Sequence, residues 1–339
     1  MSKGITFTLS NGVQIPGLGF GTFSSEGSKG EAYAAVLHAL RAGYRHLDCA
    51  WFYQNEDEIG DAIRDFLAEN EGVRRADLFI TTKVWNHLHE PADVKWSLND
   101  SLQKLRLDYV DLFLVHWPIA AEKTEDHQPK IGSDGKVRLL AREKFERCSP
   151  IYIINQELTR NPEPTWRAME ALYDEGKARA IGLSNFTIPG IEQILSFAKV
   201  PPRQPGGDPP FPPQYHARQV LPRAQHPPQA YSPLGSQNQV PNTGEKVATN
   251  PTLNQIAKEG GHTLAQVLIA WGLRRGYVVL PKSSNPARID SNFEEIDLSD
   301  AQYEAINRVA AGRHTRFVNM KDTFGYDVWP EETDGELSK

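Results

Sequence analysis

The sequence predicts an α/β fold, a (β/α)₈ TIM barrel, from two observations that extend over most of its 339 residues. Short apolar runs of strand character alternate with amphipathic helical stretches, and parallel strands require such helical returns. Polar residues of catalytic type also stand at or just after the ends of three successive predicted strands, where barrel enzymes place their active sites. A doubly wound open sheet is the alternative, but the run 17–21 (GLGFG) has the wrong glycine spacing for the dinucleotide-binding turn of that fold.

The first half of the chain contains four units in which a predicted strand is followed by a predicted helix. The strand at 110–115 is a nearly continuous apolar run, which is typical of a parallel strand buried on both faces. The helix at 92–105 carries its leucine and valine residues at helical spacing on one face. In order, the four units are 18–21 with 31–42, 46–48 with 55–67, 79–82 with 92–105, and 110–115 with 166–174.

Three more units follow, and one unit of an eight-fold barrel is left without a clear pattern. The helix at 188–197 has Pro189 in its first turn, where proline is tolerated, and Ser299 is a suitable N-cap for the helix at 299–310. The predicted strands are 178–183, 229–231 and 277–280, and the predicted helices are 188–197, 263–275, 287–293 and 299–310. We therefore expect a single barrel domain over residues 1–339.

Composition and charge exclude several classes of protein. A formal net charge of −6 provides no basic surface for nucleic acid, and no apolar run approaches the ~20 residues needed to cross a membrane. Residues 1–4 lack the apolar core of a signal peptide. The two cysteines, Cys49 and Cys148, are too few for a disulfide framework. We expect a cytoplasmic protein without a metal, either a monomer or a weak dimer, whose partner is a small molecule.

Four residues of catalytic type are associated with three neighbouring strands. Asp48, Lys83 and His116 each end or follow a strand, and Tyr53 lies in the loop after the first of them. A tyrosine phenol has a pKa near ~10, too high for an efficient acid at neutral pH, and a nearby lysine would lower that pKa. Asp48 would keep Lys83 charged, and His116 would orient a carbonyl group. Tyr53 would then protonate the carbonyl oxygen as hydride reaches the carbon.

Longer motifs around these residues resemble the signature of the aldo-keto reductase family. They are Asp48-x-Ala50-x-x-Tyr53-x-Asn55-Glu56-x-x-x-Gly60, then 114–118 (LVHWP) and 280–284 (LPKSS). The resemblance extends from about Thr6 to Trp329, apart from two segments described below. It implies a (β/α)₈ barrel, NADPH or NADP⁺ as cofactor, and a catalytic tetrad of Asp48, Tyr53, Lys83 and His116 with Tyr53 as proton donor.

The same resemblance implies a set of cofactor contacts. Ser184 and Asn185 match the pair that binds the nicotinamide amide, and Tyr231 matches the aromatic residue that stacks on the nicotinamide ring. Lys282 and Arg288 would place two cations near the additional phosphate of NADPH. The complete implied set is Thr22, Ser184, Asn185, Tyr231, Ser232, Leu234, Ser236, Lys282, Ser283, Arg288 and Asn292.

Within this family, the motifs are most similar to those of fungal NADP-dependent glycerol dehydrogenases and glyceraldehyde reductases. The similar strings are 19–23 (GFGTF), 317–320 (FVNM) and 325–330 (GYDVWP). This similarity implies the reduction of glyceraldehyde or dihydroxyacetone to glycerol, or the reverse oxidation. A reductase of aldoses or uronates and a non-catalytic or inactive barrel are the alternatives.

Aromatic residues of the same motifs are candidates for the substrate pocket. Trp51, Trp85 and Trp117 follow the three strands that carry the tetrad, and we expect them to surround the substrate together with His116. We expect residues 313–339 to form a C-terminal loop over the active site.

Residues 201–228 do not fit the barrel pattern. They contain ten of the chain's 24 prolines, and no helix persists at such a proline density. The sixth strand and helix of the barrel belong here, so we expect the sixth unit to be disrupted. One interpretation is a proline-rich insert. Another is a shift of reading frame. Synonymous codons can be chosen for residues 203–229 so that the same DNA, read from one base later, encodes VNQVEIHPFLPNTTLVKYCLEHNI. That segment resembles the sixth unit of the family.

Residues 137–156 form a second atypical insertion, before the family-like string 161–166 (NPEPTW). The codons of Val137 and Arg138 at the start of this segment, and that of Gln156 at its end, can match the two splice sites of a short intron. The segment can therefore be interpreted as a retained intron. A natural loop insertion is the alternative, since loops tolerate added length at little cost in free energy.

Overall fold

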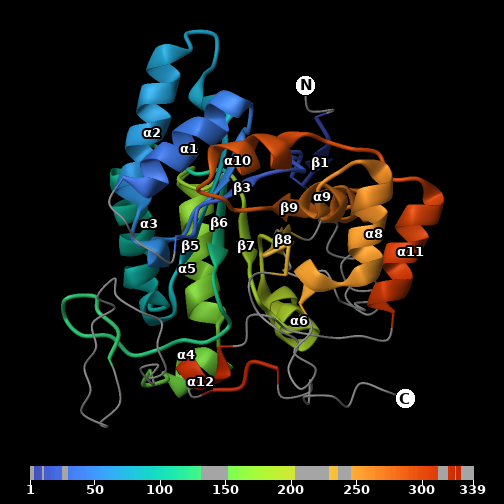
Figure 1. Ribbon diagram of the computed structural model, residues 1–339. Helices are drawn as coiled ribbons and strands as arrows, with labels where there is room; N and C mark the ends of the chain where they lie inside the picture. Colours follow the sequence, from blue (N-terminus) through green and yellow to red (C-terminus); the bar gives the residue numbers. More distant parts are fainter. Residues whose placement is uncertain are drawn as a thin grey trace.

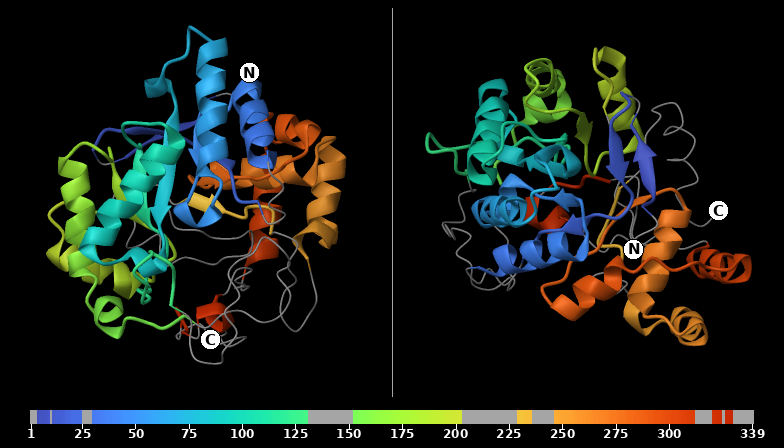
Figure 2. Two further views of the ribbon diagram at one scale, coloured as in Figure 1. Left: turned by 90° about the vertical axis from the view of Figure 1, so that its left-hand side faces the viewer. Right: turned by 90° about the horizontal axis from the view of Figure 1, so that it is seen from above.

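The structure is a computed structural model that describes residues 4–9, 11–24, 30–130, 152–202, 229–235, 246–311, 320–324 and 326–329 (Figure 1). Its centre is a set of parallel strands, and helices pack around them (Figure 2). A short antiparallel hairpin precedes the first parallel strand and consists of β1 (Thr6–Thr8) and β2 (Gln14–Pro16). Every helix in the described residues is too short or too polar to span a bilayer.

The parallel strands form two hydrogen-bonded groups. Five of them pair in the order β3-β4-β5-β6-β7, and β8 pairs with β9. The first group is β3 (Phe20–Gly21), β4 (His46–Asp48), β5 (Phe79–Val84), β6 (Leu112–Val115) and β7 (Ile181–Leu183). The second group is β8 (Gln229–Tyr231) and β9 (Val278–Leu280).

Backbone contacts join the two groups between β9 and β3. The amide of Gly19 donates to the carbonyl of Val279 at 2.9 Å, and the amide of Val279 donates to the carbonyl of Gly17 at 2.7 Å. The resulting order is β8-β9-β3-β4-β5-β6-β7, which leaves one barrel position between β7 and β8. That position falls on residues 203–228, outside the described residues, so the predicted disruption of the sixth unit stays a prediction.

The helices alternate with the strands as the sequence predicts. The helices of the first half are α1 (Glu31–Ala42), α2 (Glu56–Glu69), α3 (Pro91–Leu105), α4 (Gln156–Arg160) and α5 (Glu163–Asp174). Those of the second half are α6 (Ile188–Phe197), α8 (Pro251–Gly260), α9 (Leu264–Arg274), α10 (Pro286–Phe293), α11 (Asp300–Ala310) and α12 (Lys321–Phe324). Short 3₁₀ turns are η1 (Trp51–Tyr53), η2 (Arg75–Asp77), η3 (Asn86–Leu88) and η4 (Val247–Thr249).

Several predicted elements are confirmed with the same bounds, namely α1, α6, β4 and β8. Ser299 caps α11 as predicted, with its hydroxyl accepting from the amide of Gln302 at 3.3 Å. The hairpin β1–β2 and helix α8 were not predicted. Helix α8 nevertheless carries recognisable signals, because the Asn250 side chain accepts from the amide of Leu253 and Pro251 occupies its first position.

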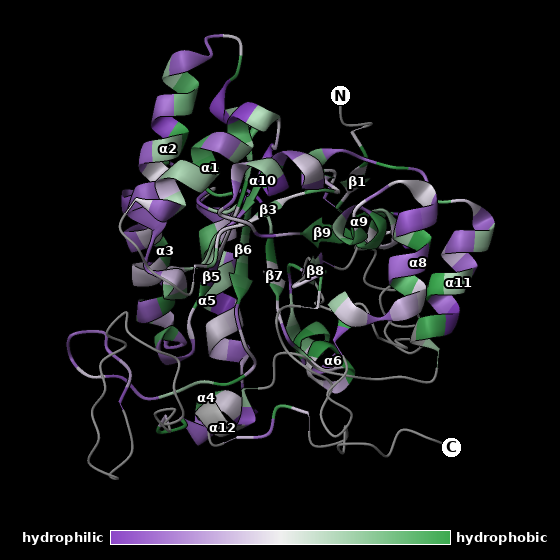
Figure 3. Ribbon diagram, in the orientation of Figure 1, coloured by the Kyte–Doolittle hydropathy of each residue, from purple (hydrophilic) through white to green (hydrophobic). Residues whose placement is uncertain are grey.

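The hydrophobic core of the described residues forms three clusters: one inside the barrel, one between the strands and the surrounding helices, and one among η4, α8, α9 and α11. Inside, side chains from several strands interdigitate, including those of Phe79, Leu112, Leu114, Ala180, Val278 and Leu280. Strands β6, β7 and β9 are apolar along their length, whereas helices α2, α3 and α11 carry polar residues on part of their surface (Figure 3). Close packing at the barrel wall requires glycine at position 19, since a Cβ there would lie 2.6 Å from Nδ1 of His46.

Candidate active site

Three adjacent strands bring the predicted catalytic residues to one edge of the barrel. Asp48 at the end of β4 is in register with Thr81 of β5, and Lys83 lies two residues further along β5. His116 directly follows β6, and its amide donates to the carbonyl of Val84 at 3.1 Å. Because the carboxyl ends of parallel strands share one edge, these side chains converge there.

Asp48 and Lys83 form a buried ion pair. Nζ of Lys83 lies 2.8 Å and 2.9 Å from the two carboxylate oxygens of Asp48, and the exposed fractions of these residues are 4% and 5%. The same ammonium donates to the backbone carbonyl of Cys49 at 2.7 Å. Burial favours the neutral amine, but the negative charge of Asp48 and then the electrostatic interaction with the Tyr53 phenol group outweigh it and raise the pKa of Lys83. Lys83 is therefore a fixed cation at every physiological pH.

Tyr53 ends the 3₁₀ turn η1 and lies over this cation. Nζ of Lys83 is 5.1 Å from the centre of the Tyr53 ring, and Phe23 contacts the same ring edge-on at 5.1 Å. Burial raises the pKa of Tyr53 to about 12, while Lys83 acts in the opposite direction and lowers it. The predicted effect of Lys83 is thus present, but burial exceeds it, so that Tyr53 keeps its proton at neutral pH.

His116 is the fourth member of the group. Its ring centre lies 5.9 Å from that of Tyr53 and 4.9 Å from that of Trp85. The side chain of Asn185 donates to the backbone carbonyl of His116 at 2.9 Å. Burial, followed by the nearby charge of Lys83 and then His89, lowers the pKa of His116 well below its usual value. The imidazole is therefore neutral at pH 7, and the structure brings all four predicted residues together.

Two polar side chains connect the loops that carry these residues. Thr22, predicted as a cofactor contact, donates from its hydroxyl to the backbone carbonyl of Asp48 at 2.9 Å. Asn55, two residues after Tyr53, donates to the backbone carbonyl of Thr22 at 2.9 Å. The loop after β3 is thereby attached to both β4 and the Tyr53 loop.

A group of aromatic side chains covers one side of His116. Trp117 contacts Trp329 with ring centres 5.6 Å apart. Phe324 of α12 lies 6.1 Å from Trp85 and 5.4 Å from Trp117, at the lower end of the strands in Figure 1. Phe324 and Trp329, from the segment 313–339, therefore lie against the aromatic side chains beside His116.

Trp51, in contrast, belongs to the packing of helix α3 and not to the group around His116. Its indole N–H donates to Asp100 at 2.7 Å, and its ring contacts Trp96 edge-on at 6.2 Å. Both partners lie on α3, on the outer side of the barrel wall. The position of Trp51 thus differs from the prediction, because the direction of a side chain in a 3₁₀ turn does not follow from sequence periodicity.

The end of the atypical insertion 137–156 is integrated into the fold. Residue Ile153 accepts from the amide of Glu122 at 2.7 Å and donates to the carbonyl of Lys130 at 3.2 Å. The buried ring of Tyr152 lies 5.8 Å from that of Phe324. Tyr152 and Phe324 were not among the predicted site residues. Their aromatic character is the one feature of the sequence that could have indicated a place in the aromatic group beside His116. Residues 131–151 lie outside the described residues.

Two of the predicted nicotinamide contacts, Ser184 and Asn185, lie beside His116. Ser184 and Asn185 follow β7, both are buried, and the Asn185 side chain donates to Oγ of Ser184 at 3.1 Å. Tyr231 ends β8 in register with Leu280 of β9. Ser232 follows with a φ of 48°, at the start of a turn in which Leu234 is partly buried. Ser236 lies outside the described residues.

The predicted phosphate contacts gather after β9 and in α10. Ser283 and Asn292 are buried, whereas Arg288 is exposed in the first turns of α10. Lys282 is one-third exposed and lies 3.4 Å from a carboxylate oxygen of Glu31. Two cations beside a helix N-terminus are a suitable site for a phosphate group.

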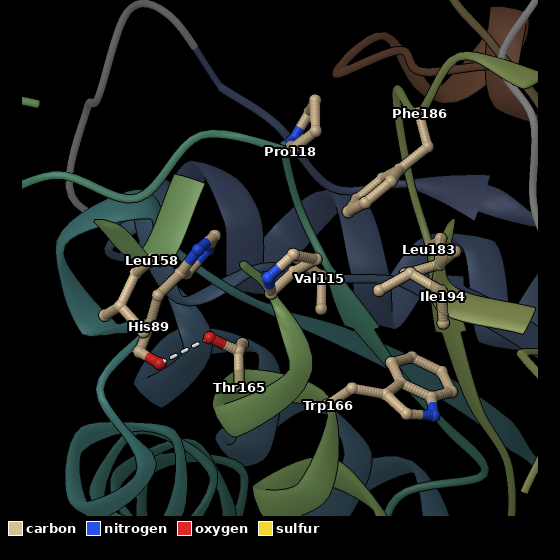
Figure 4. A pocket seen from close by; sticks show the side chains of 10 residues that line it. His89, Val115, Pro118, Leu158, Thr165, Trp166, Leu183, Phe186 and Ile194 are labelled. Atoms are coloured by element: carbon tan, nitrogen blue, oxygen red, sulfur yellow. Dashed lines mark hydrogen bonds between the residues drawn. The ribbon is translucent and has the colours of Figure 1, made fainter. Parts of the chain in front are cut away.

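A separate small pocket lies on the outer side of β6 and β7 (Figure 4). Apolar side chains such as Val115, Leu183 and Trp166 line most of it, and His89 faces it with an Nε2 that has no hydrogen-bond partner in the described part of the chain. Its room for water amounts to about 10 Å³, enough for a single molecule. No residue of the tetrad lines it.

Comparisons with known proteins agree with this geometry. The sequence matches the profile of the Aldo/keto reductase family over residues 17–205 and 212–311. It is 60% identical to the glycerol 2-dehydrogenase (NADP(+)) of Hypocrea jecorina, over 96% of this chain and 98% of that protein. It is 36% identical to the D/L-glyceraldehyde reductase of the same organism, over 91% and 88% of the two chains.

Solved structures are similar as well. The aldose reductase of Schistosoma japonicum superposes with a TM-score of 0.81 at 31% identity, covering 98% of this chain and 100% of that one. The aldose reductase of Giardia lamblia superposes with a TM-score of 0.79 at 32% identity, covering 92% and 97%. The predicted (β/α)₈ barrel and the predicted resemblance are both confirmed. The chain belongs to the aldo/keto reductase family.

Proposed function

We propose that this protein is an NADP(H)-dependent oxidoreductase that reduces small aldehydes and ketones to alcohols and catalyses the reverse oxidation. The observation that carries this proposal is the buried Asp48–Lys83 ion pair beside Tyr53 and His116. This arrangement suits proton transfer to a carbonyl oxygen, because a proton donor and a fixed cation lie next to a neutral imidazole.

Each residue has a distinct task in this proposal. Tyr53 donates its proton to the carbonyl oxygen, and the Lys83 ammonium stabilises the phenolate that remains. Neutral His116 holds the oxygen through a hydrogen bond from its ring N–H. NADPH, when bound, supplies the hydride. In the oxidative direction the Tyr53 phenolate accepts the proton of the alcohol.

The cofactor would be held by residues on the β7, β8 and β9 side of the barrel. Ser184 and Asn185 present polar side chains next to His116, where an amide group would bind. Lys282 and Arg288 would bind the additional phosphate, with Ser283 and Asn292 beside them. The remaining members of the proposed set are Thr22, Tyr231, Ser232, Leu234 and Ser236.

The proposed substrates are glyceraldehyde, dihydroxyacetone and glycerol. Support comes from the glycerol 2-dehydrogenase and the glyceraldehyde reductase to which the chain is similar. The aromatic side chains of Trp85, Trp117 and Phe324 would enclose a molecule of this size beside His116. Aldoses and uronates are the competing substrates within the family.

We also propose that the protein acts in the cytoplasm as a monomer or weak dimer and binds no nucleic acid. The support is compositional: the net charge of −6 offers no basic surface, and two cysteines suit a reducing compartment.

The test is NADPH oxidation by the chain and by Tyr53→Phe with glyceraldehyde, dihydroxyacetone, xylose and galacturonate. Loss of the general acid lowers the rate by roughly 10²–10⁴-fold, whereas NADPH binding, followed by fluorescence, stays the same. Equal rates for both proteins would remove the enzymatic proposal. A chain in which residues 203–229 are replaced by the frame-restored sequence shows whether this segment limits activity.

A further inference from the structure

A buried carboxylate next to the tetrad has no part in the proposed chemistry. Glu56 begins helix α2 three residues after Tyr53, and its exposed fraction is 1%. Burial raises the pKa of Glu56, and the hydroxyls of Thr82 and Ser101 act in the opposite direction. No lysine or arginine forms an ion pair with it in the described residues. A buried acid with hydroxyl partners alone is costly to keep, so its contacts require an explanation.

The first contact of Glu56 connects the Tyr53 segment to the strand that carries Lys83. The hydroxyl of Thr82 donates to one carboxylate oxygen at 2.5 Å. Thr82 directly precedes Lys83 in β5, and neighbouring residues of a strand point to opposite faces. Glu56 therefore holds the outer face of β5 at the point where Lys83 enters the barrel.

The second contact connects the same carboxylate to helix α3. The hydroxyl of Ser101 donates to the other oxygen of Glu56 at 2.8 Å. The neighbouring residue Asp100 accepts the indole N–H of Trp51 at 2.7 Å. Adjacent residues of one helix thus hold both ends of the segment 51–56, and Tyr53 lies between these two attachments.

Close packing of the two helices limits movement of this segment. A Cβ at Gly60 would lie 2.3 Å from the backbone carbonyl oxygen of Lys104, so α2 approaches the backbone of α3 as closely as a glycine permits. Gly60 is one helical turn after Glu56 and shares its face of α2. The start of α2 is therefore fixed against α3 by packing as well as by hydrogen bonds.

We propose that Glu56 is a positioning residue that sets the separation of Tyr53 and Lys83 through its hydrogen bonds to Thr82 and Ser101. The role rests on the proposed function, in which Lys83 must lie close enough to stabilise the Tyr53 phenolate. With a purely structural role, an apolar side chain of similar volume would lower stability by leaving the two hydroxyls unpaired but would not change the pH profile of the reaction.

The experiment compares Glu56→Gln with Glu56→Leu. Glutamine keeps an acceptor for Thr82 and offers an N–H to Ser101, so kcat and the pH profile stay close to those of the unaltered chain. Leucine fills the volume but leaves both hydroxyls unpaired. We expect kcat to fall roughly tenfold to a hundredfold with a smaller change in KM. The rising limb of the pH profile of alcohol oxidation moves to higher pH, since Tyr53 loses part of the effect of Lys83 and its phenolate forms less readily.

A matched control is Glu170→Leu. Glu170 is a buried carboxylate of α5 that accepts from the amides of Lys199 and Val200 at 2.6 Å and 2.9 Å, away from the tetrad. This variant loses stability in urea but keeps the pH profile. Thr82→Val removes one hydroxyl with little change in volume, and we expect it to move the limb in the same direction as Glu56→Leu. If Glu56→Leu does not fold, Thr82→Val serves as the test in its place.

A second readout does not depend on turnover. NMR of ¹³Cζ-labelled tyrosine, with Tyr53 assigned from Tyr53→Phe, measures the phenolate fraction at pH 11. The positioning role is supported if the phenolate fraction is smaller in Glu56→Leu or Thr82→Val than in the unaltered protein and in Glu56→Gln. This result supports the role even if no substrate is reduced and the proposed function fails. Equal fractions overturn the positioning role, whatever the activity.

Discussion

The two sides of the barrel's active edge are built differently. At the ends of β4, β5 and β6, the polar groups are buried and contact one another, as in the Asp48–Lys83 pair at 2.8 Å. After β9, the cations Lys282 and Arg288 reach solvent, and the ion pair of Lys282 with Glu31 at 3.4 Å is longer than the buried pair. We call these the catalytic side and the cofactor side.

The difference teaches how the two sides obtain their geometry. The catalytic side is organised by the fold itself, because each buried charge requires its partner before any ligand arrives. Exposed long side chains keep many rotamers, so the cofactor side acquires its final arrangement when the phosphate binds. Variants on the catalytic side should therefore change stability, whereas variants on the cofactor side should change affinity.

The largest effect is expected for Asp48→Asn. This variant leaves the Lys83 ammonium buried without a counter-charge, which lowers the free energy of unfolding by about 3–5 kcal/mol. Asp300→Asn removes the exposed partner of Arg274 and should cost less than about 1 kcal/mol. Urea denaturation of both variants measures the contrast. Similar losses would contradict the view that the catalytic side is organised by buried pairs.

A smaller effect concerns the pH dependence of stability. Folded His116 stays neutral well below pH 6.5, whereas an unfolded histidine binds a proton near that pH. The unfolded state therefore binds more protons as the pH falls, and stability that is present above pH 6.5 is lost in acid. At pH 5 we expect protonation of this histidine in the unfolded state to lower the free energy of unfolding by about 2 kcal/mol. His116→Gln removes this loss.

This prediction is checked by unfolding both proteins in urea between pH 7 and pH 5. The two curves of unfolding free energy against pH should converge toward acid. Parallel curves would mean that His116 is protonated in the folded state, and the catalytic side would then be less protected from solvent than described.

The smallest effect is expected on the cofactor side. Lys282→Met removes one charge-assisted contact to the additional phosphate and should weaken NADPH binding about tenfold, with unfolding free energy unchanged within about 0.5 kcal/mol. Fluorescence titration with NADPH and NADH measures this, since NADH lacks the phosphate and should bind equally to both proteins. Lys258→Met, an exposed lysine of α8, is the control. A large loss of stability in Lys282→Met would erase the distinction between the two sides.

Sequence reasoning predicted the parts of this protein that local patterns encode. Helix α1 and strand β4 were predicted from the alternation of helical stretches with short apolar runs, and both are confirmed. The tetrad was predicted from chemistry at strand ends, which the parallel topology necessarily places side by side. Its convergence in the structure follows from the register of β4, β5 and β6.

What could not be predicted depends on side-chain direction and on contacts between distant segments. Trp51 follows a strand like Trp85, yet it turns toward Asp100, because its partner lies on a helix with no sequence link to its loop. Tyr152 lies in a segment without recognisable pattern and still meets Phe324. Helix α8 was missed although its capping residues were readable, because its neighbourhood lacked a clear strand.

One contact of Lys83 has a consequence for how this site can change in evolution. The ammonium donates to the main-chain carbonyl of Cys49, and every amino acid offers that same acceptor. The side chain at position 49, buried among apolar neighbours, can therefore change within the limits that core packing sets, while the lysine keeps its partner. Apolar substitutions of similar volume can adjust the packing of the wall behind the catalytic residues and leave this acceptor of Lys83 in place.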